Sequence, residues 1–128
     1  MSSIYSHLKK MSPQLLVSNL EQSINFYTNK LGFNLAFSYE NFYAAVGKDH
    51  FSIHLKSGKP LLKERMQKRD NQDIDLIFSV DKIEDLYLRA LAESIEIVQP
   101  LRNMPYAKEF YIADPDGYIL AFIEETKN

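Results

Sequence analysis

The stretch LVSNLEQSINFYTNKLGF, residues 16–33, decides the fold of the first half of the chain. Asn19 is a typical helix N-cap, and Gly32 is a typical residue for the left-handed position that follows a helix. We therefore predict a helix over 20–31, preceded by a strand at Gln14–Val17. Apolar side chains recur in the stretch at the spacing of one helix face, namely at Leu20, Ile24, Tyr27 and Leu31.

Short strand-like runs follow the predicted helix and complete a first module. They lie at 34–39, 42–46 and 51–56, and polar or glycine-containing turns separate them. The next segment, SGKPLLKERMQKRDNQ at 57–72, is polar and basic, so we predict a connection between modules with one helical turn near 61–66. Two interpretations remain for it, a solvated linker and a lid over a binding site.

The same pattern then repeats. A strand at 74–80 leads into a second helix, which Asp81 is predicted to cap with Glu84 completing a capping box. Val17 corresponds to Val80, and His54 corresponds to Ala121. The repeat predicts an α+β fold of two β-α-β-β-β modules, each too small to stand alone. The remaining predicted strands of the second module are 95–98, 109–112 and 118–123.

Length and composition set the outer limits. The chain has 128 residues, 45% of them hydrophobic and 25% charged, which suits one globular domain at 1–128. The absence of cysteine excludes disulfides, thiolate metal sites and thiol nucleophiles. A net charge of −2 gives no argument for nucleic acid or a membrane surface, and no apolar run is long enough to span a membrane, so a cytoplasmic location is expected. Within the domain we place the first module at 11–56, the connection at 57–72 and the second module at 73–125.

Alternation along the predicted strands gives each sheet one face under its helix and one face turned away. The face turned away is half apolar, which is unusual for a face in water. A curved sheet lined in this way forms a cup with a few polar anchors, which predicts a small-molecule site, whereas a covering partner subunit is the alternative. The predicted lining is Gln14, Leu16, Ser52, His54, Asp75, Ile77, Ala121 and Ile123.

Aromatic residues border this predicted cup. Phe37 and Phe42 are candidates to stack on a flat ligand, although such side chains more often serve as core or dimer contacts. Met104 and Tyr106 lie in a loop predicted to border the same groove. Further aromatic residues on or beside these strands are Tyr39, Tyr43, Phe110 and Tyr111.

Two motifs resemble a known superfamily. The stretch 16–33 resembles its opening strand and helix, and EFYIADPDGYILAF at 109–122 resembles its closing hairpin. Over roughly 11–125 the chain is similar to the vicinal oxygen chelate superfamily of glyoxalase I, extradiol dioxygenases, fosfomycin-resistance enzymes and bleomycin-resistance proteins. The resemblance implies two modules that pair into a curved mixed sheet shaped as a cup.

The resemblance also implies where the enzymes of this superfamily hold a divalent metal. Ala121 stands where those enzymes usually carry a carboxylate. Alternation puts Glu124 on the opposite strand face, and Glu125 shares the right face but lies four residues away, so neither replaces it. The ligand set is then incomplete, so no cofactor is expected, with His54 and Asp75 as the only weak metal candidates. Carried over by position, the ligand sites fall at Ser12 or Gln14, His54, Asp75 and Ala121.

With the small residue Ala121 at this position, the closing motif is most similar to that of the metal-free branch, which contains the bleomycin-resistance proteins. That likeness implies a homodimer that binds a small-molecule ligand in an apolar cup, with no catalytic residue assigned. The alternatives are a metal-dependent lyase, isomerase or dioxygenase, and a structural or regulatory dimer without a small ligand. No nucleic-acid or membrane partner is expected.

Overall fold

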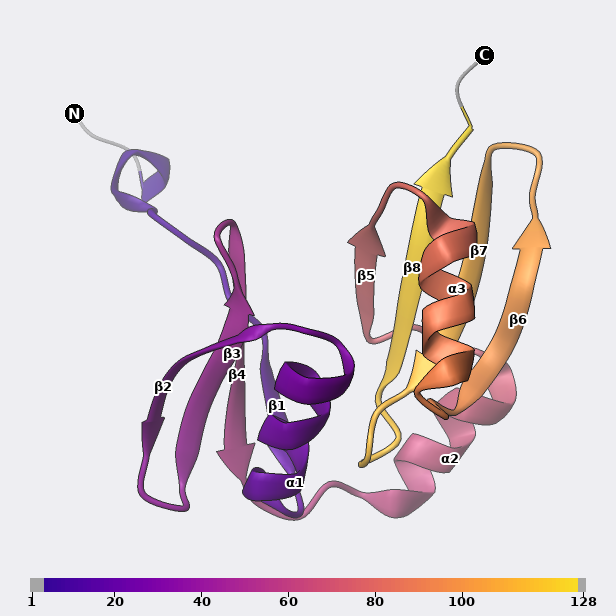
Figure 1. The fold of residues 1–128 in the computed structure, drawn as a ribbon. Coiled ribbons are helices and arrows are strands. Elements are labelled where there is room, and N and C mark those ends of the chain that lie inside the picture. The colour runs from indigo at the N-terminus through magenta and orange to yellow at the C-terminus, as the bar shows by residue number, and fades with distance from the viewer. Residues whose placement is uncertain (1–3, 127–128) are drawn as a thin grey trace. The chain divides into compact units, whose positions relative to one another are not determined.

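The structure, a computed structural model, describes residues 4–126. The chain divides into two compact units, one ending at Lys59 and the other beginning at Pro60. The boundary falls inside the connection predicted at 57–72. Each unit contains one four-stranded sheet with a helix across one of its faces (Figure 1). The prediction of two β-α-β-β-β modules in an α+β fold is therefore confirmed.

In the first unit the sheet has the strand order β1-β4-β3-β2. β1 runs parallel to β4, and the other neighbours are antiparallel, so the sheet is mixed. A short 3₁₀ helix, η1, precedes the sheet. The elements are η1 (Ile4–His7), β1 (Gln14–Val17), α1 (Leu20–Asn25), η2 (Phe26–Lys30), β2 (Asn34–Tyr39), β3 (Tyr43–Lys48) and β4 (Phe51–Ser57).

The first helix lies where it is predicted, but its hydrogen bonding changes halfway. Asn19 caps α1, because its Oδ1 accepts the backbone N–H of Gln22 at 3.0 Å. After Asn25 the helix widens into the π-helical turn η2, which keeps the neighbouring aromatic rings of Phe26 and Tyr27 both buried. Gly32 follows with φ +78°, the left-handed conformation predicted there.

The second unit repeats this arrangement with the strand order β5-β8-β7-β6. β5 is parallel to β8, and the remaining pairs are antiparallel. An additional helix precedes the first strand. The elements are α2 (Leu62–Asn71), β5 (Leu76–Ser79), α3 (Ile83–Ala92), β6 (Ile97–Asn103), β7 (Ala107–Ala113) and β8 (Ile119–Glu125).

The strand registers confirm the internal repeat. Gln14 lies opposite His54 in the first sheet, and Ile77 lies opposite Ala121 in the second. On the other side of these strands, Ala45 lies opposite His54 as Tyr111 lies opposite Ala121. His54 and Ala121 therefore occupy equivalent positions in the two sheets.

Two predictions for the second module are corrected. The connection carries a helix of 10 residues, α2, instead of one turn near 61–66. β6 extends to Asn103, well beyond the predicted strand at 95–98, because a tight turn joins it to β7. In that turn the Met104 N–H donates to the Ala107 carbonyl at 2.7 Å, so the strands pair up to the loop.

The cap predicted for the second helix is also wrong. Asp81 is exposed, and Lys82 occupies the N-cap position of α3 with φ +50° and no capping side chain of its own. Glu124 on β8 supplies the acceptors instead, because its carboxylate accepts the N–H groups of Lys82 at 3.2 Å and Ile83 at 3.1 Å. A carboxylate at this end also complements the helix dipole.

The cores lie between each helix and its sheet. In the first unit Val17, Val46 and Leu55 are fully buried under α1 and η2. In the second unit aromatic rings pack in series from the helix into the sheet. Their members are Tyr87 of α3, Phe110 of β7, Phe122 of β8 and Phe78 of β5, with centroids 5.0–5.3 Å apart.

Candidate functional site

The sheet face opposite α1 carries most of the predicted contacts of the first module. Gln14 and His54 lie side by side on it, and Leu16 lies beside Lys56. A bulge between Leu35 and Phe37 turns Phe37 onto this face, opposite Ala45. We call this surface the β1–β4 face.

A chain of hydrogen bonds links three side chains on the β1–β4 face. Gln14 Nε2 donates to Tyr43 Oη at 3.0 Å, and Tyr43 Oη lies 2.8 Å from His54 Nδ1. The chain fixes the imidazole ring from one side, so Nε2 is the nitrogen of His54 that remains for a ligand.

Aromatic rings surround His54. Phe37 and Tyr43 have nearly parallel rings, 6° apart in plane with centroids at 6.2 Å, and the imidazole stands almost perpendicular to both. Phe42 lies beside Tyr43, with centroids at 6.1 Å. About half of the Phe37 and Phe42 surfaces is exposed, 47% and 49%, so these rings are available to a ligand.

Tyr43 is a site residue that the sequence did not single out beyond its aromatic character. Alternation places it on the β1–β4 face opposite Lys56, but its bonds to both Gln14 and His54 depend on the pairing of three strands. Strand pairing across the sheet is not visible in a single run of residues, so only the order of the strands could have indicated it.

The corresponding face of the second sheet is different in character. Tyr111, Ala113, Ile119 and Ala121 form a buried cluster on it, with Ile74, Val98 and Ile123 packed against them. Ala121 is completely buried, whereas its neighbour Ile77 is 63% exposed. Of the predicted contacts in this sheet, Ile77 is therefore the most open to a ligand.

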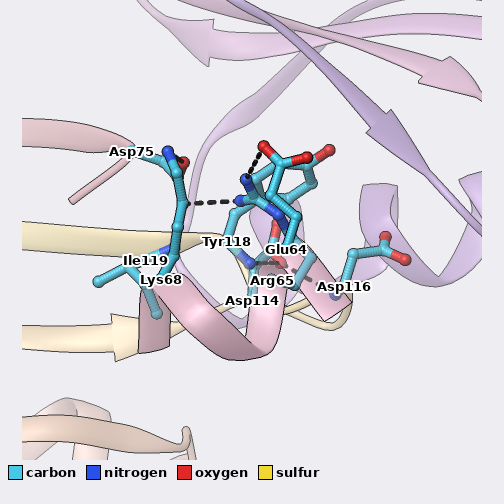
Figure 2. A network of polar contacts seen from close by, with 8 residues as sticks. All are labelled: Glu64, Arg65, Lys68, Asp75, Asp114, Asp116, Tyr118 and Ile119. Carbon is cyan, nitrogen blue, oxygen red and sulfur yellow. Dashed lines mark hydrogen bonds and ion pairs between the residues drawn. The ribbon is translucent and has the colours of Figure 1, made fainter. Parts of the chain in front are cut away.

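Asp75, predicted in the cup, lies at the end of this face against α2 (Figure 2). Its Oδ2 accepts from Arg65 Nη1 at 2.9 Å and from the Ile119 N–H at 2.8 Å, and its Oδ1 accepts from Lys68 Nζ at 2.8 Å. Burial alone would raise the pKa of Asp75, but the bonds from Lys68, Ile119 and Arg65 together hold that pKa below its ordinary value. Both oxygens are thus occupied in fixing α2 to the sheet.

Arg65 is the residue of α2 that binds Asp75. It is buried, its guanidinium carbon lies 4.3 Å from the centroid of the Tyr118 ring, and Glu64 approaches it at 3.7 Å. A helix held by a buried arginine is a fixed part of the second unit, which disfavours a freely swinging lid.

A second polar cluster on this face was missed in the sequence. Glu109 is buried, and its Oε2 accepts from Arg102 Nε at 2.8 Å, from Arg102 Nη2 at 2.6 Å and from Tyr111 Oη at 3.0 Å. Burial and the neighbouring Glu109 carboxylate raise the pKa of Tyr111, and the same carboxylate raises the pKa of Arg102. Two register shifts in β6 bring Arg102 opposite Glu109, and such shifts carry no clear sequence signal.

The loop between β6 and β7 carries the last two predicted contacts. Met104 is partly buried, and Tyr106 is 65% exposed at the tip of the hairpin. The Tyr106 carbonyl accepts the Thr126 N–H at 3.1 Å, so the tip is tied to the end of β8.

The side chains at the implied metal positions do not fit a divalent metal. Ser12 Oγ is hydrogen-bonded to Ser52 Oγ at 2.8 Å, the Asp75 oxygens are both used, and Ala121 offers only a methyl group. Only His54 Nε2 and Gln14 Oε1 keep an open ligand atom, and two ligands fall short of the three that a catalytic metal site needs. Within residues 4–126, no group of three or more His, Cys, Asp or Glu side chains could hold a metal ion.

None of the helices in the described part of the chain is both long and apolar enough to cross a membrane.

Solved structures share this fold at low sequence identity. UcmS2 is 17% identical with a TM-score of 0.75, over 91% of this chain and 98% of its own. TnmS3, an antibiotic binding protein from Streptomyces sp. CB03234, is 17% identical with a TM-score of 0.73, over 93% of this chain and 97% of its own. A glyoxalase/bleomycin resistance protein/dioxygenase from Alicyclobacillus acidocaldarius is 16% identical with a TM-score of 0.73, over 93% of this chain and 92% of its own.

These likenesses show the fold alone, and no curated protein matches the chain. The family model supplies the stronger relationship, because it matches residues 6–122 and so covers both sheets and the connection between them. The chain belongs to the Glyoxalase/Bleomycin resistance protein/Dioxygenase superfamily.

Proposed function

We propose that this protein binds a small molecule, without a metal, on the sheet faces turned away from α1 and α3. The observation that carries the proposal is the β1–β4 face, where exposed aromatic rings surround a histidine held by hydrogen bonds. Binding sites typically combine apolar and aromatic walls with a few placed polar groups. On the sheet of the first unit the proposed contacts are Gln14, Leu16, Phe37, Phe42 and His54. On the sheet of the second unit, taken by itself, they are Ile77, Met104, Tyr106 and Ile123.

Two residues of the predicted lining take other roles in this proposal. Asp75 orients α2, since both of its oxygens are engaged. Ala121 is buried beside the more exposed Ile77 on the neighbouring strand. A missing carboxylate at position 121 favours the metal-free branch of the superfamily, and the antibiotic-binding neighbour TnmS3 supports a natural-product antibiotic as the class of ligand to test first.

We further propose that the protein is a homodimer. All six residues of β2 are exposed, and among them Phe37 and Tyr39, which share one face, are large hydrophobic side chains exposed by 47% and 63%. Exposed apolar side chains gathered on one strand are typical of a surface that a partner covers.

A thermal-shift screen tests the binding function. Bleomycin and a panel of aromatic and aliphatic antibiotics are added in excess to the full chain, and a ligand present at about 100 times its Kd should stabilise the fold by about 2.7 kcal/mol. His54→Ala should lower the shift produced by any hit, whereas Tyr5→Ala, in the exposed helix η1, should leave it unchanged. If no compound raises the melting temperature, the proposed function is wrong.

A further inference from the structure

The hydrogen-bond chain on the β1–β4 face determines which proton His54 presents. Tyr43 Oη accepts from Gln14, so its own hydroxyl proton is available to His54 Nδ1. The opposite direction, with Nδ1–H donating to Tyr43, would leave the hydroxyl proton without a protein partner among residues 4–126. With Gln14 Nε2 as the donor to Tyr43, the arrangement that satisfies every member puts the imidazole proton on Nε2, and this N–H is the donor that His54 offers to a ligand.

The positively charged side chain of Lys56 lies on the same face as the His54 donor. Lys56 follows His54 on the same strand face, opposite Tyr43 and Leu16, with its Cα about 7 Å from that of His54. Lys56 makes no ion pair within the part of the chain that the structure describes. The residues that share its face from β1, β3 and β4 are polar, apolar or basic, and none is acidic: Gln14, Leu16, Tyr43, Ala45, Gly47, Ser52 and His54.

The aromatic side of the face adds a requirement on shape. Phe37 presents about half of its surface, and its ring is nearly parallel to that of Tyr43. A third flat ring placed on Phe37 would extend this parallel pair at favourable stacking geometry. An aliphatic ligand of equal size would bury the same area without that gain.

We infer that the β1–β4 face binds a planar aromatic anion, such as an aromatic carboxylate or phenolate, with its ring on Phe37 and its negative group between His54 Nε2–H and Lys56. This inference rests on the proposed function and narrows its ligand class. The donor from His54 and the unpaired ammonium group of Lys56 select the negative charge, and Phe37 selects the flat ring.

Calorimetric titration of the full chain with three probes tests the inference. 2-Naphthoate carries both features, decahydro-2-naphthoate keeps the charge but loses the flat ring, and 2-naphthylmethylamine keeps the ring but reverses the charge. We expect 2-naphthoate to bind, the saturated acid to bind about tenfold more weakly, and the amine to give no measurable binding.

Matched variants separate the two contributions. Phe37→Leu should weaken 2-naphthoate by about fivefold but leave the saturated acid nearly unchanged. Lys56→Met should weaken both acids by roughly threefold, whereas Lys48→Met, which alternation places on the opposite face, should weaken neither. Tyr5→Leu, an exposed aromatic side chain in η1, is the control for Phe37→Leu.

The outcomes separate the inference from the proposed function. If the amine or the saturated acid binds as tightly as 2-naphthoate, or if Phe37→Leu and Lys56→Met leave 2-naphthoate unaffected, the aromatic-anion inference is wrong and small-molecule binding stands. If the probes fail while an antibiotic in the thermal-shift screen binds, the inference alone fails. If nothing binds in either experiment, both proposals fail.

Discussion

At the scale of single residues, Asp75 shows how a polar side chain on a sheet face can serve the fold instead of a ligand. The sequence places it correctly on the face turned away from α3, but that position alone does not say what meets it. Arg65 and Lys68 come from the connection, where they look like part of a solvated basic segment. Their role appears only when α2 is packed on the sheet.

The ion pair between Asp75 and Arg65 gives a stability prediction. Asp75→Asn should lower the free energy of unfolding at pH 7 by about 1–3 kcal/mol, because it leaves the buried guanidinium without its main carboxylate partner. This range is below the loss expected for a fully buried ion pair for two reasons. Lys68, the other cation bound to Asp75, is 33% exposed, and the amide oxygen in the variant can still accept the Ile119 N–H. Urea unfolding measures the change, with the exposed Asp73→Asn as the control.

The pH dependence of that contribution has a definite sign. The pKa of Asp75 is lower in the folded protein than its ordinary value of about 3.9, so the folded state favours the ionised carboxylate. The stabilisation is therefore complete above about pH 5 and is lost as the pH falls below about 4 and through the folded pKa. Wild type should lose more stability than Asp75→Asn over this acid range, and equal losses would contradict the assignment.

At the scale of elements, Glu124 on β8 caps a helix that begins far away in sequence. Glu124→Ala should lower the free energy of unfolding by about 1 kcal/mol, since it removes both acceptors at the start of α3 and a favourable charge at its dipole. Glu125→Ala, at the exposed next position, should change it far less. Urea midpoints compare the two variants, and equal effects would show that the cap contributes nothing specific.

The elements also show which parts of the fold were predictable. Helices and strands with a regular apolar period, such as α1 and β1, lie at their predicted residues because burial of one face determines them. α2 was underestimated because it attaches through charged side chains and has no apolar stripe. Bulges in β2 and β6 change the sheet face on which Phe37 and Arg102 lie, and no local sequence pattern predicts such register shifts.

At the scale of the whole molecule, the proposed function predicts independence from metal. Dialysis against a chelator should leave both the melting temperature and the affinity for 2-naphthoate unchanged, because only His54 and Gln14 among the implied ligand positions keep an open ligand atom, which is fewer than a metal site needs. Metal analysis of protein purified without chelator provides the check. Stoichiometric zinc, nickel, iron or manganese that disappears in His54→Ala would overturn the metal-free proposal.

The proposed dimer makes a separate prediction for the whole molecule. Sedimentation equilibrium should give twice the mass of the chain, and Tyr39→Lys on the exposed strand β2 should shift the protein toward monomer by placing a charge in the interface. Gln22→Lys, at an exposed position of α1, adds the same single positive charge away from β2 and is the matched control. A monomer at all concentrations for wild type would contradict the proposed dimer.

The repeated registers have a consequence for how this protein can change over time. His54 and Ala121 are equivalent positions, and so are Tyr43 and Glu109. In the first unit these positions hold Tyr43 bound to His54, whereas in the second unit Glu109 is paired with Arg102. A chain that carries its scaffold in duplicate has two independent copies of each position to vary. One copy is free to acquire a new recognition surface while the other keeps its own, which makes duplication itself a source of new specificity.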